Sequence, residues 1–408
     1  MPEYITGLDI GTTKIGVVIG EVDPDEEVRI VAVSTAPSDG LRRGVVVNLD
    51  KTVRSIERAV SEAERMAGIQ VDAVYAGIAG DHIRSINGRG VVAVAGPNNE
   101  ITEDDVRRVI DAAKAVALPI DREIIHILPQ EFIVDEQRGI RDPVGMAGVR
   151  LEAEVHIVTG AVTSAQNIYR SIERAGLKVK DLVLEPLASS YAVLTEDEKE
   201  LGVALIDLGG GTTDIAMFFQ GSIRHTGVVA LGGRNVTNDI AIGLRTPLEQ
   251  AEAIKIQHGS AVHRPEDDKQ VIEVPGIGGR TPRRVSKALL VDIIQPRMEE
   301  ILTLAYEEIK RSEFAHLMNG GVVLTGGGSL LDGTLELAEE VFGTQVRLGL
   351  PRSLTGLTSE AKSPIHATGV GLVLYGMQQD GADMTHPGGE GGLFETIVNK
   401  MKKWLGLE

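Results

Sequence analysis

The sequence predicts an α/β fold in which one strand-rich unit occurs twice, and three observations support this prediction. The segment Leu8-Asp9-Ile10-Gly11-Thr12-Thr13 returns in altered form as Ile206-Asp207-Leu208-Gly209-Gly210-Gly211-Thr212-Thr213. Each copy follows one apolar strand pattern and precedes two more, which indicates an internal duplication. The chain has 408 residues, which is too long for one ordinary core, so two or more domains are expected.

The first copy is expected to form three strands, at residues 4–9, 15–22 and 29–35. Apolar residues then recur at helical spacing over 50–67, where Asp50 suits an N-cap and Gly68 suits the position after the last turn. A further strand is expected at 71–76.

From about His82 the pattern changes to short strands separated by glycines, which predicts a compact α+β insertion over 82–160. Thr102 and the three acidic residues after it predict the start of a helix that runs to about Ala117. The remaining elements are expected as strands at 124–128, 130–134 and 153–158, a helix at 164–175, a strand at 182–184 and a helix at 186–194.

The second copy is expected to form strands at 203–207, 214–220 and 222–230. Helices dominate 235–314, interrupted by a polar segment at 263–284. A strand at 322–325 then leads into a glycine turn and a helix that begins near Leu330. The run 379–392 is rich in glycine and polar residues, which predicts a flexible linker.

The composition excludes several kinds of protein. A net charge of −18 disfavours non-specific nucleic-acid binding, and the absence of cysteine excludes disulfides and thiolate metal sites. The nine histidines form no cluster with zinc-ligand spacing. The N-terminus lacks the features of a signal peptide, and no apolar run is long enough to span a bilayer, so we expect a protein that stays inside the cell.

Two of the glycine segments suit the binding of phosphate groups. In Asp9-Ile10-Gly11-Thr12-Thr13-Lys14, glycine and small hydroxyl residues allow backbone N–H groups to approach phosphate oxygens. Asp207-Leu208-Gly209-Gly210-Gly211-Thr212-Thr213-Asp214 repeats the pattern with three glycines. Each segment alone also fits an ordinary turn, but two opposed hairpins can hold a triphosphate, with Asp9 and Asp207 beside a hydrated Mg²⁺.

A third segment, Thr325-Gly326-Gly327-Gly328-Ser329-Leu330, leads from a strand into a helix. Such a turn can admit a flat base and its sugar against the backbone. A simple strand-to-helix connection would have the same pattern. Its position after the two phosphate-type segments favours the nucleoside interpretation.

These three segments, in this order, resemble those of the actin, Hsp70 and sugar-kinase ATPase superfamily. The resemblance implies an actin-like duplicated ATPase fold that binds ATP and Mg²⁺. It implies Glu185, Asp9 and Asp207 as catalytic residues, with Glu185 near the attacking water and the two aspartates beside the metal. It assigns Glu252 and Lys255 to the ribose and base, although their spacing also suits a solvated ion pair. The residues that it implies for nucleotide binding are Gly11, Thr12, Thr13, Lys14, Gly209, Gly210, Gly211, Thr212, Thr213, Glu252, Lys255, Gly326, Gly327, Gly328 and Ser329.

Within the superfamily, the segment from Ala76 to Ile83, followed by Asn87-Gly88-Arg89-Gly90, is similar to the FtsA family of bacterial cell-division proteins at its entry into an inserted subdomain, 1C. The resemblance implies the following division: subdomain 1A at 1–81, 161–194 and 366–378; 1C at 82–160; 2A at 195–231 and 303–365; 2B at 232–302; a linker at 379–392; and a terminal helix at 393–408.

Residues 393–408 predict an amphipathic helix. At 100° per residue, its apolar residues fall on one arc, with lysines at the edges and on the polar side. This arrangement is typical of a helix that lies in a membrane interface, although docking on the protein's own core is the commoner fate of such helices. The preceding linker and the local lysines on an acidic protein favour the membrane. The residues expected to contact it are Leu393, Phe394, Ile397, Val398, Lys400, Met401, Lys402, Trp404 and Leu405.

The resemblance implies a cell-division protein that polymerises on the inner membrane face at the septum, tethers the FtsZ ring through the FtsZ tail and recruits later division proteins. One weak membrane helix per chain needs several copies for stable attachment, which suits a filament. ATP hydrolysis, if any, is expected to be slow. The alternatives are a soluble small-molecule kinase of the same superfamily, an Hsp70-like chaperone, for which no β-rich substrate domain follows, and a PilM-like pilus-assembly ATPase.

Overall fold

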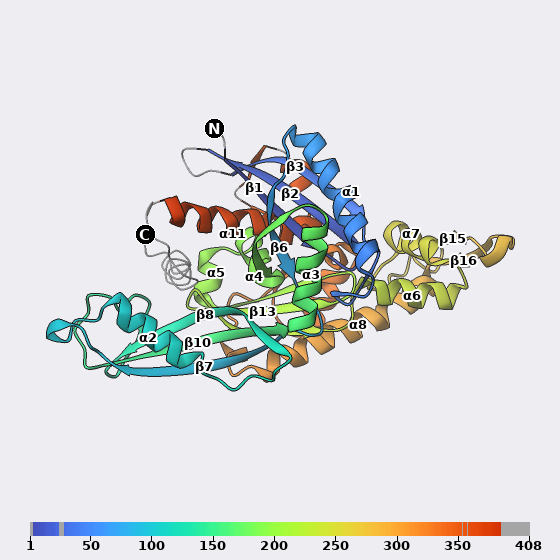
Figure 1. Cartoon of the computed structure of the whole chain (residues 1–408). Coiled ribbons are helices and arrows are strands. Elements are labelled where there is room, and N and C mark those ends of the chain that lie inside the picture. The colour runs from blue at the N-terminus through green and yellow to red at the C-terminus, as the bar shows by residue number, and fades with distance from the viewer. Residues whose placement is uncertain (1–2, 24–27, 353, 357, 385–408) are drawn as a thin grey trace.

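The computed structural model describes residues 3–23, 28–352, 354–356 and 358–384. It consists of two halves with one sheet each, an insert that extends from the first half, and a small lobe that extends from the second (Figure 1). Within the described residues, no helix has the length and apolar character needed to cross a membrane. The terminal helix predicted at 393–408 lies outside the described residues.

The first half is built on a six-stranded sheet in the order β11-β6-β1-β2-β3-β19. β1 pairs antiparallel with β2 and parallel with β6, and α11 packs against both β1 and α4. The strands are β1 (Glu3–Ile10), β2 (Lys14–Val22), β3 (Val28–Pro37), β6 (Ala73–Ile78), β11 (Lys178–Leu184) and β19 (Thr355–Gly356), beside a small hairpin of β4 (Leu41–Arg42) and β5 (Val45–Val46). The helices are α1 (Leu49–Ala67), α3 (Val162–Arg174), α4 (Glu185–Val193), α10 (Thr358–Ala361) and α11 (Ala367–Met384).

The second half repeats this design, which confirms the predicted duplication. Its sheet has the order β14-β13-β12-β17-β18, so β12, β13 and β14 take the places of β1, β2 and β3, with the same pairing directions. Its elements are β12 (Val203–Leu208), β13 (Thr213–Phe219), β14 (Ser222–Val229), β17 (Val322–Thr325), β18 (Val346–Leu348), α5 (Glu196–Leu201) and α9 (Thr334–Phe342).

The insert is a four-stranded antiparallel sheet with one helix on it, in the order β7-β10-β8-β9. Apolar side chains of α2 and the sheet form a separate core that includes Val109, Phe132 and Leu151. The Thr102 hydroxyl caps α2, and Asp105 returns the bond to the Thr102 backbone, as the sequence predicts. The elements are β7 (Arg84–Ala93), α2 (Glu103–Ala113), β8 (Arg122–Val134), β9 (Gln137–Ile140) and β10 (Arg150–Ala161).

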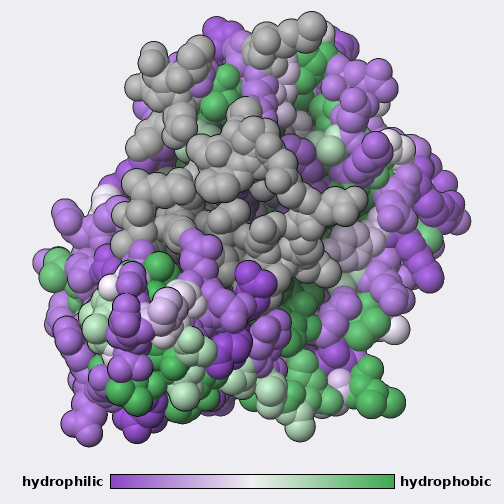
Figure 2. All heavy atoms as spheres, turned by 60° about the vertical axis from the view of Figure 1, so that its left-hand side comes forward, coloured by the Kyte–Doolittle hydropathy of each residue, from purple (hydrophilic) through white to green (hydrophobic). Residues whose placement is uncertain are grey.

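The small lobe of the second half joins three helices and a hairpin. The polar segment predicted at 263–284 contains most of this hairpin, and α8 continues through Pro296 back towards the sheet. The elements are α6 (Gly233–Leu244), α7 (Leu248–His258), β15 (Val271–Val274), β16 (Arg283–Ser286) and α8 (Lys287–Arg311). Figure 2 shows one face of the whole molecule as largely hydrophilic, with hydrophobic residues gathered in its lower part.

Five local predictions were wrong. Asn48, not Asp50, caps α1, because its side chain accepts from Lys51 N at 3.0 Å. α2 ends at Ala113 rather than near 117, and the two strands predicted at 124–128 and 130–134 are the single strand β8.

The other two errors concern helix boundaries near the C-terminal end. The helix expected near Leu330 is a short 3₁₀ turn, and α9 begins only at Thr334. α11 continues to Met384, six residues into the predicted linker, because extending an existing helix costs far less than starting one. The rest of that linker lies outside the described residues.

Candidate functional site

A cavity of about 1030 Å³ lies between the two halves, and most of the predicted site residues line it. The duplication places equivalent hairpins, β1–β2 and β12–β13, on opposite walls. The predicted residues that line the cavity are Asp9, Gly11, Thr12, Thr13, Lys14 and Glu185 from the first half, and Asp207, Gly209, Gly210, Gly211, Thr212, Glu252, Lys255, Gly326, Gly327 and Gly328 from the second.

The tips of the two hairpins touch each other. A side chain at Gly210 would lie 2.5 Å from Thr13 Cγ2, and one at Gly211 would lie 2.5 Å from Thr12 Oγ1. Only glycine can therefore occupy these two positions while the threonines keep their places. Thr12 Oγ1 also accepts a hydrogen bond from Gly44 N at 3.0 Å, which fixes its orientation.

Two buried aspartates stand at the ends of the equivalent strands. Asp9 forms an ion pair with Lys14 Nζ at 2.7 Å. Asp207 Oδ2 accepts hydrogen bonds from Ser189 Oγ at 3.2 Å and Thr368 Oγ1 at 3.4 Å. Burial raises the pKa of Asp207 to about 6, and the negative charge of Asp9 adds to this rise.

Two more carboxylates complete an acidic wall. Asp214 accepts from the Thr212 hydroxyl at 2.8 Å through Oδ2, whereas its buried Oδ1 has no hydrogen-bond partner. Burial raises the pKa of Asp214 to about 7. Burial and the charge of Asp9 raise the pKa of Glu185 well above its usual range. Gly77 leaves room for Glu185, whose Cγ would lie 3.0 Å from a side chain at that position.

The glycine turn at Gly326 and α7 also line the cavity. Gly326 has φ +80° and ψ 168°, a conformation that is essentially restricted to glycine. On α7, Lys255 Nζ donates to Glu252 Oε2 at 2.8 Å, to Thr237 Oγ1 at 3.0 Å and to Gly233 O at 3.2 Å. Lys255 and Glu252 are thus joined to the start of α6, beside the second hairpin.

Two predicted residues do not line the cavity. The Thr213 hydroxyl donates to Leu231 O at 2.9 Å, and the Ser329 hydroxyl donates to Gly326 O at 2.6 Å. Both side chains are buried, and their hydroxyls bond backbone carbonyls instead of facing the cavity. Their hydroxyls help to shape the turns on which the neighbouring glycines lie.

Several cavity residues were not identified as site residues from the sequence. Asp214 closes the second motif, and only its burial marks it as different from a surface aspartate. Ser38 lines the cavity with a buried, unpartnered hydroxyl, and Thr368 contacts Asp207 from α11. No local pattern distinguishes these two residues. Among the residues that the structure describes, no three His, Cys, Asp or Glu side chains are arranged to hold a metal ion directly.

Solved structures with related folds support the actin-like assignment. The PilM–PilN type IV pilus biogenesis complex aligns with a TM-score of 0.67 at 18% identity, over 91% of this chain and 98% of the other. MreB5 of Spiroplasma citri bound to ADP aligns with a TM-score of 0.54 at 14% identity, over 90% of this chain and 94% of the other. At these identities the likeness establishes the fold alone.

Sequence relatives identify the family more closely. Family models match for the SHS2 domain inserted in FtsA, at residues 80–159, and for the cell division protein FtsA, at residues 204–371. The chain is 48% identical to the cell division protein FtsA of Pseudomonas aeruginosa, over 99% of this chain and 97% of that protein. It is 41% identical to that of Escherichia coli, over 99% of this chain and 96% of that protein. The chain therefore belongs to the FtsA family of bacterial cell-division proteins.

Proposed function

We propose that the cavity binds Mg·ATP and that the bound chain polymerises on the inner face of the cell membrane. The contact between the two hairpin tips carries the proposal, because it brings two glycine-rich turns and their strand-end aspartates to one point. A triphosphate lying there would meet backbone N–H groups from both halves. MreB5 structures bound to ADP and to AMPPNP supply a precedent within the fold.

The described residues fit this ligand. Lys14 can leave Asp9 for a phosphate oxygen, and Asp9 and Asp207 would then hold Mg²⁺ through its water molecules. The ion would supply the positive charge that four carboxylates and a triphosphate need in one cavity. Glu252 and Lys255 would contact the ribose and base, and Gly326, Gly327 and Gly328 would lie along the nucleoside.

Hydrolysis is proposed to be slow at most. The raised pKa of Glu185 makes this carboxyl a candidate proton acceptor for water near the phosphates. The Glu185 side chain lines the cavity, and among the described residues no hydrogen bond holds this side chain in one orientation. A loosely oriented base positions water poorly, which limits the rate.

Membrane attachment is proposed to reside in residues 393–408. Their sequence places Leu393, Ile397 and Trp404 on one apolar face and lysines at its edges. Filaments would gather many such helices and make the attachment stable. By family membership, the partners at the septum would include the FtsZ tail, further copies of this chain and later division proteins. The subdomain boundaries given above stay a prediction.

Two of the other candidate functions, pilus assembly and small-molecule phosphorylation, are less well supported. A pilus-assembly role rests on a fold likeness at 18% identity, whereas relatives with at least 41% identity over almost the full chain are cell-division proteins. A small-molecule kinase would phosphorylate a substrate added with ATP. Incubation with a panel of sugars and carboxylic acids would reveal such an activity.

Co-sedimentation with anionic liposomes tests the proposal. The full chain and a chain ending at Gly392 are compared, each with and without Mg·ATP. We expect only the full chain to sediment, and more of it with Mg·ATP, with filaments visible on the lipid. A result in which both chains stay in solution under all conditions would overturn the membrane proposal.

Two point variants distinguish insertion of the apolar face into the lipid from a general effect of charge on lipid binding. Trp404→Glu places a carboxylate on the apolar face, and Asn399→Glu places the same charge on the polar face. We expect the first to abolish sedimentation and the second to reduce it only slightly. Equal losses would mean that net charge, rather than insertion, governs binding.

A further inference from the structure

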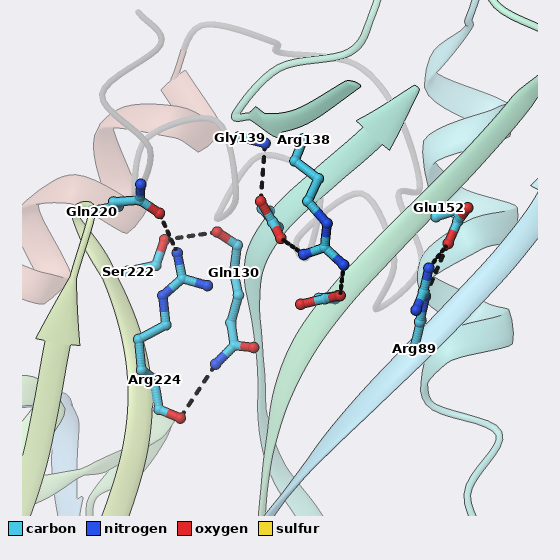
Figure 3. A network of polar contacts seen from close by, with 10 residues as sticks. Arg89, Gln130, Arg138, Gly139, Glu152, Gln220, Ser222 and Arg224 are labelled. Carbon is cyan, nitrogen blue, oxygen red and sulfur yellow. Dashed lines mark hydrogen bonds and ion pairs between the residues drawn. The ribbon is translucent and has the colours of Figure 1, made fainter. Parts of the chain in front are cut away.

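The insert contacts the second half along the edge strand β14. Gln130 Nε2 on β8 donates to Ile223 O at 2.9 Å and to Arg224 O at 3.4 Å. Ser222 Oγ on β14 donates to Gln130 O at 3.1 Å, and Figure 3 shows this bond and the one to Arg224 O. Gln130 and Ser222 are both buried. Because β14 is the last strand of its sheet, its outward carbonyls would otherwise lack strand partners, and the insert supplies them.

Gln130 can reach β14 because it is the extra residue of a β-bulge. In the pairing of β8 with β10, Glu131 lies opposite Glu154 and Pro129 lies opposite Val155, so Gln130 has no partner. A bulge turns one residue out of the ladder and redirects its polar groups. Both the carbonyl and the side chain of Gln130 are therefore directed at the second half.

Two further contacts join the insert to β14, and together with the Gln130 contacts they form one seam between the insert and the second half. Ser85 Oγ on β7 donates to Thr226 O at 3.1 Å, and His156 Nε2 on β10 lies 3.0 Å from Thr226 Oγ1. His156 and Thr226 are buried. Parting the insert from β14 would leave these buried polar groups without partners, which makes the seam costly to open.

Charge contributes to the same seam. Arg224 on β14 is buried and donates to Phe219 O and Gln220 Oε1, both at 3.1 Å, within its own half. Burial lowers the pKa of Arg224, whereas the negative charges of Glu131 and Glu154 on the insert raise it. On the insert, Arg138 holds these two carboxylates in place, as Figure 3 shows.

The same strand also binds the first half. Four residues before Gln130, His126 Nε2 accepts a hydrogen bond from Leu184 N at 3.0 Å, in a buried position. Leu184 directly precedes Glu185 of the cavity wall. At the base of the insert, Arg122 donates to His82 O and to Thr159 O, each at 2.9 Å, and so ties together the two segments by which the chain enters and leaves it.

We propose that the insert is a strap that restrains the angle between the two halves, with β8 fixed to the first half at His126 and to the second at Gln130. The strap joins the two halves between which the nucleotide is proposed to bind, so this inference deepens the proposed function. A partner that holds or displaces the insert would then change how far the two halves close, and with it the affinity for the nucleotide.

Paired spin labels can measure the angle, because the chain has no cysteine of its own. Arg58→Cys on α1 and Glu299→Cys on α8 place labels on exposed positions of the first and second halves. The distance distribution is recorded without nucleotide in the otherwise unchanged chain, with Gln130→Ala, and with Gln137→Ala. Gln137 is an exposed glutamine of β9 in the same insert, so it serves as the matched control.

We expect Gln130→Ala to broaden the distance distribution and Gln137→Ala to leave it unchanged. Ser222→Ala, which removes one hydrogen bond and almost no volume, should broaden it to a smaller extent and covers the case in which Gln130→Ala fails to fold. Unchanged widths in folded Gln130→Ala or Ser222→Ala would overturn the strap. Because these measurements need no ATP, failure of the proposed nucleotide binding would appear separately, in an ATP titration of the unlabelled chain.

Discussion

The two neighbouring glycines Gly326 and Gly327 should respond in opposite ways to the same substitution. At Gly326, an alanine Cβ would lie 2.7 Å from Leu208 O and would also meet the Asp207 carboxylate. At Gly327, the nearest atom to an alanine Cβ is Ile365 Cγ1 at 3.8 Å, which is an ordinary contact. The difference comes from the backbone, since only Gly326 has a positive φ.

The expected magnitudes follow from these geometries. For Gly326→Ala, the backbone conformation costs about 1–3 kcal/mol, and the overlap with the second hairpin costs about 1–3 kcal/mol more. The free energy of unfolding should therefore fall by about 2–6 kcal/mol. For Gly327→Ala, reduced freedom of the unfolded chain should raise it by about 0.4–1 kcal/mol.

Urea titrations followed by far-UV circular dichroism compare the two variants with the parent chain. The midpoint should move to lower urea for Gly326→Ala and should stay or rise slightly for Gly327→Ala. Equal midpoints for the two variants would refute the reasoning, because both substitutions add the same methyl group to the same turn.

Three further predictions concern other parts of the molecule. Burial raises the pKa of Asp214 from 3.8 to about 7, so ionisation of this carboxyl destabilises the nucleotide-free fold increasingly as pH rises between these values. Asp214→Asn should therefore raise the free energy of unfolding, measured by urea titration, by at most about 4 kcal/mol at pH 8 and should not change it near pH 4. Lys255→Met should weaken binding of a fluorescent ATP analogue by about 10- to 100-fold, through loss of a charged hydrogen-bond donor, whereas Lys310→Met, at an exposed position of α8, should not change it. Thr102→Ala should lower the free energy of unfolding by about 1 kcal/mol, because the capping box of α2 is lost, and an unchanged urea midpoint would contradict that role.

The sequence predicts those parts of the structure that depend on local chemistry. Glycine and hydroxyl residues after an apolar strand mark both hairpins, because few other residues allow such turns. The duplication predicts that the hairpins face each other. The capping residues of α2 mark its start for the same local reason.

Other parts depend on contacts between distant segments. Two strands were expected at 124–128 and 130–134, yet β8 continues through a bulge at Gln130 because β10 pairs on both sides of it. Thr213 and Ser329 belong to the motifs, but their hydroxyls find nearer backbone partners than the cavity. The roles of Ser189 and Thr368 arise only when α4 and α11 meet at Asp207.

The hairpin contact has a consequence for the history of the fold. The threonines of the first hairpin, Thr12 and Thr13, occupy the space that Gly210 and Gly211 of the second leave free. Two identical hairpins related by a twofold axis would bring threonine against threonine, or glycine against glycine across a gap. This close fit is therefore available only to two copies whose sequences differ. Within one chain the two copies can differ in sequence, so that one loop supplies side chains and the other supplies room.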